Sequence, residues 1–498
     1  MRRQGWAAAA GSIAVLAWAV GNARAETLGE AIALAYQTNP TLQAERAQLR
    51  ATDEEYAQAQ AGLRPTIGVS GSYTYQNGDI SETGAPDFKL SGGGETGTIS
   101  VTQPLYTGGL ASAKIDAAHA DILAERETLR RTEIGVLQNV IGSYLDVRRD
   151  QEQLRISQDN VNVLQHQLDE TDARFEAGQL TRTDVAQSQA RLALGRSQLA
   201  AALSTLAQAR AAYAAVVGQN PGELAAEPPI AALLPPSVDA AFDAAEARNP
   251  QLRGAMDAEL AAAARLAEAK AQRRPTVAVT GQYGYVAQTQ GVSAGGFNQS
   301  VGLFESQLGG TISAQVNIPI SNGGLYASDI RQAAEQDNVR RIQIEGARRD
   351  VLQQVSQAWN QLLGARASLT ADEEQVKSDT VAYEGVRQEQ KVGLRTILDV
   401  LNAQQELETS QLQLVSARHD EYVAAAAVLA ATGALEAGAL IPDTPRYDPE
   451  ANFDRVRHAP GWVPWEGAVH AIDRAAGPAP TPMPPPSPPG EVVKTATP

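Results

Sequence analysis

The chain has 498 residues, a formal net charge of −16, no cysteine and only 5% aromatic residues. The absence of cysteine excludes disulfides, zinc–thiolate sites and an N-terminal cysteine that could carry a lipid anchor. The acidic balance argues against a nucleic-acid partner, and the scarcity of large side chains favours elongated helices over a thick globular core.

Residues 1–25 are predicted to be a secretory signal peptide. Arg2 and Arg3 precede an apolar run over residues 6–20, and residues 23–25 have the small-x-small pattern of a cleavage site. Without Arg2, Arg3 and Arg24, 38 basic residues remain against 57 acidic ones, a formal charge of −19. No later stretch has the roughly 18 apolar residues of a membrane-spanning helix. The mature chain is therefore expected to be exported without a helical membrane anchor.

The exported part is predicted to be a tandem repeat followed by a tail. Asn39-Pro40 and Arg64-Pro65 recur as Asn249-Pro250 and Arg274-Pro275 at a spacing of 210, and later landmarks recur at a spacing of 215. The tail is rich in proline and small residues, a composition typical of disorder. The predicted segments are a first repeat over 26–226, a linker over 227–238, a second repeat over 239–441 and a largely disordered periplasmic tail over 442–498.

Each repeat contains a predicted strand hairpin, over residues 65–104 and 275–319. In the first, Ile67 and Val69 alternate with hydroxyl residues such as Ser70, so one face is apolar and the other polar. A half-buried sheet in water is the usual interpretation of this pattern. Two isolated hairpins beside much longer helices favour strands in lipid instead. Tyrosines near the loop ends would form an aromatic girdle in the outer membrane: Tyr73, Tyr75, Tyr283 and Tyr285.

Each strand hairpin is followed by a predicted helical hairpin, over 110–217 with its tip near 178–184 and over 325–432 with its tip near 393–399. After the first tip, an apolar residue recurs every seven positions from Val185 to Tyr213, which indicates an antiparallel coiled coil. An ordinary amphipathic bundle is the alternative. At each tip a glycine ends one helix and a threonine precedes the Asp-Val that opens the next.

Strands in lipid must have all their backbone groups paired, so four strands cannot remain with open edges. Eight strands leave an interior that side chains largely fill, whereas more strands leave an aqueous lumen. Three chains with twelve strands are therefore the smallest assembly that fits the polar face. The predicted fold class is an α+β membrane protein whose trimer forms a 12-stranded outer-membrane β-barrel, continuing into a long periplasmic coiled-coil barrel.

From Leu28 to about Leu440 the chain resembles the TolC family of outer-membrane efflux and secretion channels. The most specific match is the second tip, residues 392–403. The resemblance implies a homotrimeric, porin-like channel in the outer membrane that extends into the periplasm and is gated at the helix tips. It also implies two partners, a periplasmic adaptor (membrane fusion protein) and an inner-membrane pump, either an RND antiporter or an ABC transporter. The cargo would be drugs, type I secreted proteins or both.

The resemblance also implies a set of gate residues. Asp399 and Asn402 correspond to the family's paired acidic rings, although the second is an amide here. Thr183 and Asp184 correspond to residues that tie the closed tips together, with Arg395 as their basic partner. Gln390 stands where the family has an aromatic partner. The tips would dock the adaptor through Gly178, Gln179, Leu180, Thr181, Gly393, Leu394, Arg395 and Thr396.

Two alternatives accompany these predictions. Asp184 and Asp399 are also explained as helix N-terminal capping residues, a role that can coexist with gating. A soluble periplasmic coiled-coil adaptor is the competing function, although four alternating strands and two helical hairpins favour the channel. The five histidines form no pair at ligand spacing and no catalytic constellation is evident, so no metal, cofactor or enzymatic activity is predicted.

Overall fold

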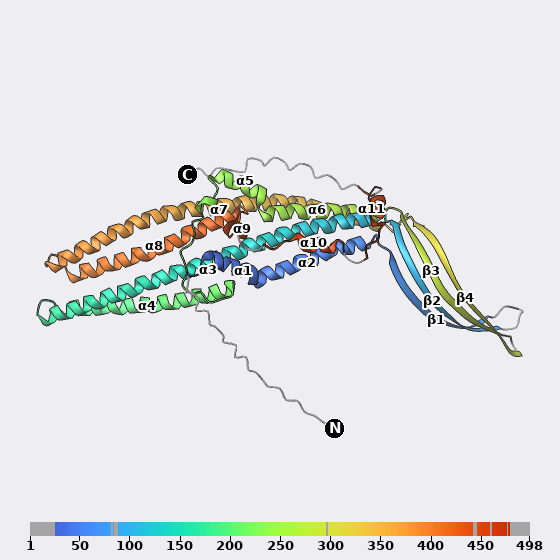
Figure 1. Cartoon of the computed structure of the whole chain (residues 1–498), viewed down its shortest axis with the longest axis horizontal. Helices are drawn as coiled ribbons and strands as arrows, with labels where there is room; N and C mark the ends of the chain where they lie inside the picture. Colours follow the sequence, from blue (N-terminus) through green and yellow to red (C-terminus); the bar gives the residue numbers. More distant parts are fainter. Residues whose placement is uncertain are drawn as a thin grey trace, which may run out of the picture.

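The computed structural model describes residues 25–80, 83, 88–294, 297–441, 446–458, 461–475 and 477–478. All but the last residue of the predicted signal peptide lies outside these ranges. The described chain is elongated, with a long helical body at one end and a curved sheet at the other (Figure 1). The strands are β1 (Thr66–Ile80), β2 (Phe88–Tyr106), β3 (Thr276–Ala294) and β4 (Phe297–Asn317). The helices are α1 (Leu28–Thr38), α2 (Pro40–Ala61), α3 (Leu110–Glu176), α4 (Arg182–Val217), η1 (Ala231–Leu233), α5 (Val238–Arg248), α6 (Pro250–Ala271), α7 (Leu325–Lys391), α8 (Ile397–Ala431), α9 (Ala437–Leu440), α10 (Glu450–Val456) and α11 (Glu466–Ala475).

The four strands form one antiparallel sheet in the order β1-β2-β3-β4. The register aligns Val69 with Ile99, and Ile99 with Tyr283, so these side chains share one face. This face is apolar and open to the surroundings, with Ile67 73% and Ile312 85% exposed. Within the described residues β1 and β4 each pair on one side only, which leaves two unpaired edges.

The opposite face of the sheet is lined by hydroxyl groups that bond across the strands. Ser70 Oγ lies 2.9 Å from Thr98 Oγ1, and Ser72 Oγ lies 2.7 Å from Thr96 Oγ1. Thr102 Oγ1 and Thr280 Oγ1 continue the row at 3.2 Å. The alternation predicted from the sequence therefore separates an aliphatic face from a wettable one.

Two helical hairpins, α3–α4 and α7–α8, form most of the body. The long helices α3 and α7 each have 67 residues and so extend about 100 Å. Their returning partners, with 36 and 35 residues, are about half as long. The predicted combination of four antiparallel strands per chain with long helical hairpins is confirmed.

Asn39 joins α2 end to end with α4, and Asn249 joins α6 end to end with α8. The first joined pair of helices lies along α3 and the second along α7 (Figure 1). Asn39 Oδ1 caps α2 by accepting from the backbone N–H of Thr41 (3.0 Å), and its Nδ2 donates to Val216 O in the last turn of α4 (3.0 Å). Asn249 caps α6 in the same way and donates to Ala431 O of α8 at 2.8 Å. One side chain thus satisfies a free N–H and a free C=O at the meeting helix ends.

The main apolar core lies where these helices meet, and two tyrosines at its centre are fully buried. The Tyr144 hydroxyl lies within hydrogen-bond distance of the carbonyl oxygens of Glu26 and Ala225, at 2.9 and 2.7 Å, and its single proton is shared between them. Tyr213 donates to the Glu26 carboxylate at 2.7 Å. Burial raises the pKa of Tyr144 to about 12, so this hydroxyl remains a donor. These bonds tie the start of the mature chain, and the segment after α4, to the core.

The prediction of a largely disordered tail is wrong for two segments after residue 442. Helices α10 and α11 pack against α2, α3 and β2. Val456 and Val469 are buried, and Asn452 Nδ2 donates to Asp53 Oδ2 at 2.7 Å. The proline-rich stretch at the chain end lies outside the described residues.

Hydropathy identifies no helix among the described residues that is both long and apolar enough to span a bilayer.

The end-to-end helix junction can be tested at Asn249. Aspartate at this position keeps the cap but cannot donate to Ala431 O, and it places a carboxylate beside that carbonyl. We expect Asn249→Asp to destabilise the helical body by about 1–3 kcal/mol, measured as a lower midpoint of thermal unfolding by circular dichroism. Ser237→Asp is the matched control, because Ser237 caps α5 through Ala240 N alone and aspartate is an equivalent cap. Equal effects of both changes would contradict the role of the amide donor.

Candidate functional site

The two helical turns at the far end of the body have the same construction. Gly178 and Gly393 adopt left-handed φ angles of 76° and 83°. Each turn then has a capping box. The Asp184 carboxylate accepts from the backbone N–H (2.8 Å) and the hydroxyl (2.7 Å) of Thr181. Because free N–H groups lie at this helix end, a carboxylate is held there in its charged form.

Asp399 repeats this arrangement with Thr396, at 2.9 Å from the backbone nitrogen and 2.7 Å from the hydroxyl. The hydrogen bonds from the Thr396 hydroxyl and backbone lower the pKa of Asp399, and those from the Thr181 backbone and hydroxyl lower the pKa of Asp184. The capping interpretation of both aspartates is therefore confirmed. Both carboxylates remain partly exposed at the tips, so capping does not exclude a second role at a channel mouth.

Within one chain, the structure does not bring the predicted latch residues together. Arg395 Nε pairs with Glu389 Oε2 at 2.9 Å in its own turn, while Asp184 stays in its capping box and Thr183 is exposed. Gln390 is only 6% exposed, in the last turn of α7. A contact of Arg395 with Thr183 or Asp184 of another chain stays a prediction.

The structure instead shows a contact between the hairpins that the sequence did not indicate. Arg191 of α4 donates Nη2 to Asn402 Oδ1 of α8 at 2.9 Å, and Nη1 to Gln405 Oε1. Asn402, predicted as the second gate position, is thus held by a cation from the first hairpin. No local pattern could have found this pair, because 211 positions separate the two residues.

Apolar packing supports this contact. Leu401 of α8 is buried against Leu164 and Leu192 of the first hairpin. One turn further, Gln404 Nε2 donates to Asn160 Oδ1 at 3.1 Å. The tip half of α8 therefore lies against α3 and α4 through one leucine cluster and several neutral or charge-assisted hydrogen bonds.

A second polar contact between the hairpins lies nearer the core. His419 Nε2 of α8 is 3.0 Å from Asp146 Oδ1 of α3, and its Nδ1 is 2.8 Å from Asp420 Oδ1. Burial disfavours the protonated ring, but the hydrogen bonds to Asp146 and Asp420 outweigh this and raise the pKa of His419. The bond to His419 is the largest influence that lowers the pKa of Asp146. Arg149 of α3 also contacts Asp146 at 2.8 Å.

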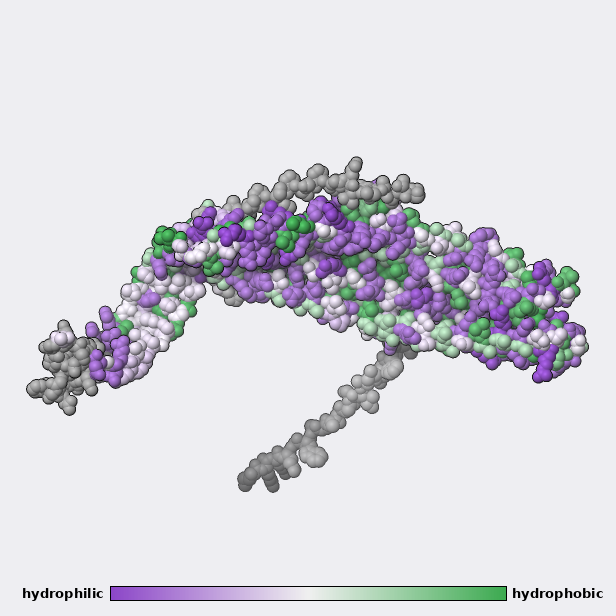
Figure 2. Space-filling model, turned by 180° about the vertical axis from the view of Figure 1, so that it is seen from behind, coloured by the Kyte–Doolittle hydropathy of each residue, from purple (hydrophilic) through white to green (hydrophobic). Residues whose placement is uncertain are grey.

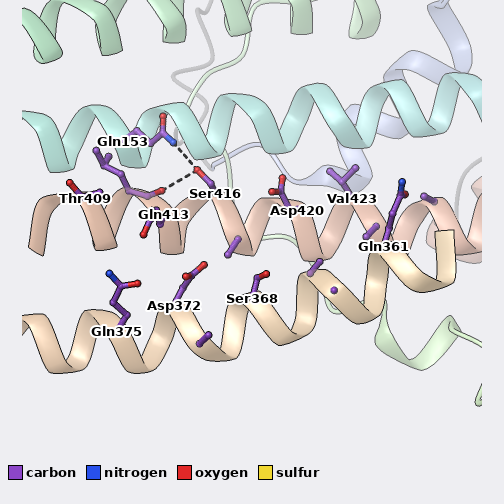
Figure 3. A pocket seen from close by; sticks show the side chains of 17 residues that line it. Gln153, Gln361, Ser368, Asp372, Gln375, Thr409, Gln413, Ser416, Asp420 and Val423 are labelled. Atoms are coloured by element: carbon purple, nitrogen blue, oxygen red, sulfur yellow. Dashed lines mark hydrogen bonds between the residues drawn. The ribbon is translucent and has the colours of Figure 1, made fainter. Parts of the chain in front are cut away.

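A groove of about 1060 Å³ lies between α7 and α8 (Figure 3). Ser368 and Asp372 of α7 face Ser416 of α8 across it, and Gln153 of α3 donates to Ser416 Oγ at 3.2 Å. Most of the lining side chains are small or uncharged. Its polar groups are mainly side-chain amides and hydroxyls, together with the carboxylates of Asp372 and Asp420.

The four tyrosines of the predicted girdle share the apolar face of the sheet and are exposed. They do not share one hydrogen-bonded row. Tyr73 is in register with Glu95, and Glu95 with Ala287, so Tyr285 lies two positions and Tyr283 four positions nearer the helices. Figure 2 shows the strands mostly in white and green, in contrast to the largely purple helical body.

Among the described residues, no group of three or more histidine, aspartate or glutamate side chains is placed to hold a metal ion.

An open four-stranded sheet with an exposed apolar face, continued by helices about 100 Å long, defines the protomer of an outer-membrane channel with a periplasmic extension. The chain belongs to the outer membrane efflux protein family, whose model matches residues 31–219 and 241–434. The predicted resemblance to the TolC family is thereby confirmed.

Individual relatives agree with this assignment. The chain is 34% identical to the outer membrane efflux protein BepC of Brucella suis, over 87% of this chain and 91% of BepC. It is 25% identical to the outer membrane protein TolC of Escherichia coli, over 83% of each. Its fold matches the crystal structure of the Campylobacter jejuni CmeC outer membrane channel with a TM-score of 0.70 at 14% identity, covering 86% of this chain and 89% of that one.

The protein is therefore an efflux duct of the outer membrane that extends into the periplasm. Its family is one of channel proteins. The alternative of a soluble periplasmic adaptor is not supported.

The Arg191 contact can be tested by conductance. Loss of its two hydrogen bonds removes about 1 kcal/mol of attachment per chain at this half-exposed position. We expect Arg191→Ala to raise single-channel conductance in planar bilayers several-fold. Arg196→Ala is the control. It removes the same charge from the same helix, but Arg196 donates to Gln165 within the first hairpin and makes no bond to α8 among the described contacts. If Arg395→Ser raised conductance but Arg191→Ala did not, the contact that keeps the duct closed would lie between chains at the turns and not between the two hairpins of one chain.

The His419 contact predicts a pH dependence. A histidine whose pKa is raised on folding stabilises the fold below its unfolded value of about 6.5, and that stability is lost as pH rises through the folded value. We expect the thermal unfolding midpoint of the purified protein to fall by a few degrees as pH rises from about 6 to 9. In His419→Gln the fall should be smaller. The same fall in both proteins would assign the effect to other groups.

Proposed function

We propose that three copies of this chain close one 12-stranded barrel, with the apolar face toward lipid and the hydroxyl face toward an aqueous lumen. The observation that carries the proposal is the pair of unpaired edges on β1 and β4. In hydrocarbon each unpaired backbone group costs several kcal/mol, so β1 of one copy must pair with β4 of the next. Tyr73, Tyr75, Tyr283 and Tyr285 then face the bilayer.

The helical hairpins of the three copies would continue the lumen across the periplasm and narrow at the tips. Asp399 supplies one ring of three carboxylates there. Three such charges repel one another by about 0.5–1 kcal/mol per pair in water. The Arg191 bonds to Asn402 and Gln405 offset this repulsion by holding α8 against the first hairpin. Closure would therefore be only slightly favoured, so a modest force at the tips could open the duct.

That force would come from a periplasmic adaptor docked on the turns at 178–181 and 393–396, coupled to an inner-membrane RND antiporter or ABC transporter. Exposed apolar side chains at the second turn, Val392 and Leu394, support this site. The pump would select the cargo, whether drugs, type I secreted proteins or both. The chain itself would conduct passively and catalyse no reaction.

The trimer can be tested with engineered cysteines, since the natural chain has none. Ser72→Cys on the polar face of β1 would be combined in turn with Gln307→Cys, Gly309→Cys or Thr311→Cys on β4, which samples three registers. We expect mild oxidation of one combination to give covalent dimers and trimers, with the trimer as the largest species on denaturing gels. Each single-cysteine variant should remain monomeric. Ladders beyond three chains, or none in any combination, would contradict a closed trimer.

A further inference from the structure

The C-terminal helix α11 lies beyond the region that the family model matches, which ends at residue 434. It packs where the strands meet the helical body, against β2 and α3 (Figure 1). A short helix in this place is fixed at the periplasmic end of the sheet. Its two faces differ, one bound to the chain and the other exposed.

Asp473 attaches α11 to the start of α3. It is fully buried and accepts from the backbone N–H and hydroxyl of Thr107 (2.6 and 2.8 Å), the N–H of Gly109 (3.1 Å), and the N–H and hydroxyl of Ser112 (3.2 and 2.8 Å). Burial raises the pKa of Asp473, but these hydrogen bonds outweigh it and lower the value. Asp473 supplies the cap that Gly109, the N-cap of α3, has no side chain to make.

A buried ion pair fixes the other end of the helix. Arg64 Nε lies 3.1 Å from Glu466 Oε2, and its Nη2 donates to Glu466 Oε1 at 3.3 Å. Between these anchors Val469 packs against Leu63, Ala111 and Ile115. The inner face of α11 therefore has a fixed orientation relative to the strands, and the outer face is fixed with it.

Large apolar side chains are exposed in the turn that leads into α11 and along one side of the helix. Trp462 is 60% and Trp465 50% exposed, and Ile472, seven positions after Trp465, is also exposed. Trp465 Nε1 donates to Gln103 Oε1 at 3.0 Å. Gln103 alternates with Val101 and Ile99, so it belongs to the apolar face of β2. Trp465 thus lies on the lipid side of the sheet, directly below its apolar band.

The spacing from Gln103 to Tyr75, the tyrosine of the predicted girdle that lies farthest from the helices, matches a bilayer. Tyr75 is in register with Gly93, ten positions along β2 from Gln103. Ten residues at about 3.3 Å each, tilted about 40°, give roughly 25 Å of height. This is the height of the apolar band of an outer-membrane barrel, which has aromatic girdles at both interfaces.

We propose that α11 and the turn before it form an interfacial anchor, which inserts Trp462 and Trp465 of the turn and Ile472 of the helix into the headgroup region of the inner leaflet of the outer membrane. Indole rings favour this layer because one edge donates a hydrogen bond while the ring is apolar. The proposal rests on the proposed orientation of the apolar face toward lipid. The C-terminal segment would then provide the periplasmic girdle that the strands themselves lack at this level.

Tryptophan fluorescence can test the anchor, because only Trp359, Trp462 and Trp465 follow the predicted signal peptide. Trp359 lies in α7, 34 residues from its first residue Leu325 and so about 50 Å from the strand end. Trp359→Phe therefore reports the two anchor tryptophans, and the double variant W462F/W465F reports Trp359 alone. Each variant would be reconstituted into phosphatidylethanolamine–phosphatidylglycerol vesicles with brominated acyl chains.

We expect bromine near the headgroups to quench at least half of the Trp359→Phe emission and bromine near the chain ends to quench less. The double variant should show no quenching by either lipid. Equal emission in brominated and plain vesicles would overturn the anchor. Full quenching by aqueous iodide would then indicate a water-exposed surface, and protection from iodide would indicate a protein-covered one. Conductance recorded on the same vesicles separates the outcomes: an unquenched but conducting channel contradicts the anchor alone, whereas loss of conductance in every variant contradicts the proposed barrel.

Discussion

The backbone groups on the outer edges of β1 and β4 are the constraint on which the architecture depends. Each edge presents a row of N–H and C=O groups on a sheet whose other exposed feature is an aliphatic face. Water could hydrogen-bond to the edges but would leave the apolar face exposed. Lipid could cover that face but could not hydrogen-bond to the edges. The proposed pairing of β1 with β4 between copies closes the edges and leaves the face to the lipid. The rest of the chain then has to carry the resulting lumen away from the membrane, which helices of 67 residues do.

The helical body combines two kinds of contact. The first hairpin has an apolar seam to which Leu164 and Leu192 contribute, whereas towards the tips α8 meets that hairpin through Leu401 and through separable polar pairs such as Arg191 with Asn402. Apolar seams resist separation over their whole length, while hydrogen bonds at half-exposed positions exchange readily with water. This difference favours movement of whole hairpins over unravelling of either one.

Local patterns explain which features could be predicted. The tips were found because glycine followed by Thr-x-x-Asp specifies a turn and a cap within a few residues, and the strands because alternation is local. Arg191 was missed because its partner is 211 positions away. The order in α11 was missed because a ten-residue helix is hidden in a proline-rich tail, and only Arg64 and Thr107, far upstream, give it a place to bind.

The Asp473 cap has a consequence for the order of assembly. The residue that completes the start of α3 follows Thr107 by 366 positions, so the first strand-to-helix corner stays incomplete until nearly all of the polypeptide has crossed the inner membrane. A prematurely terminated product would retain two hairpins and four strands and yet leave free N–H groups at that corner.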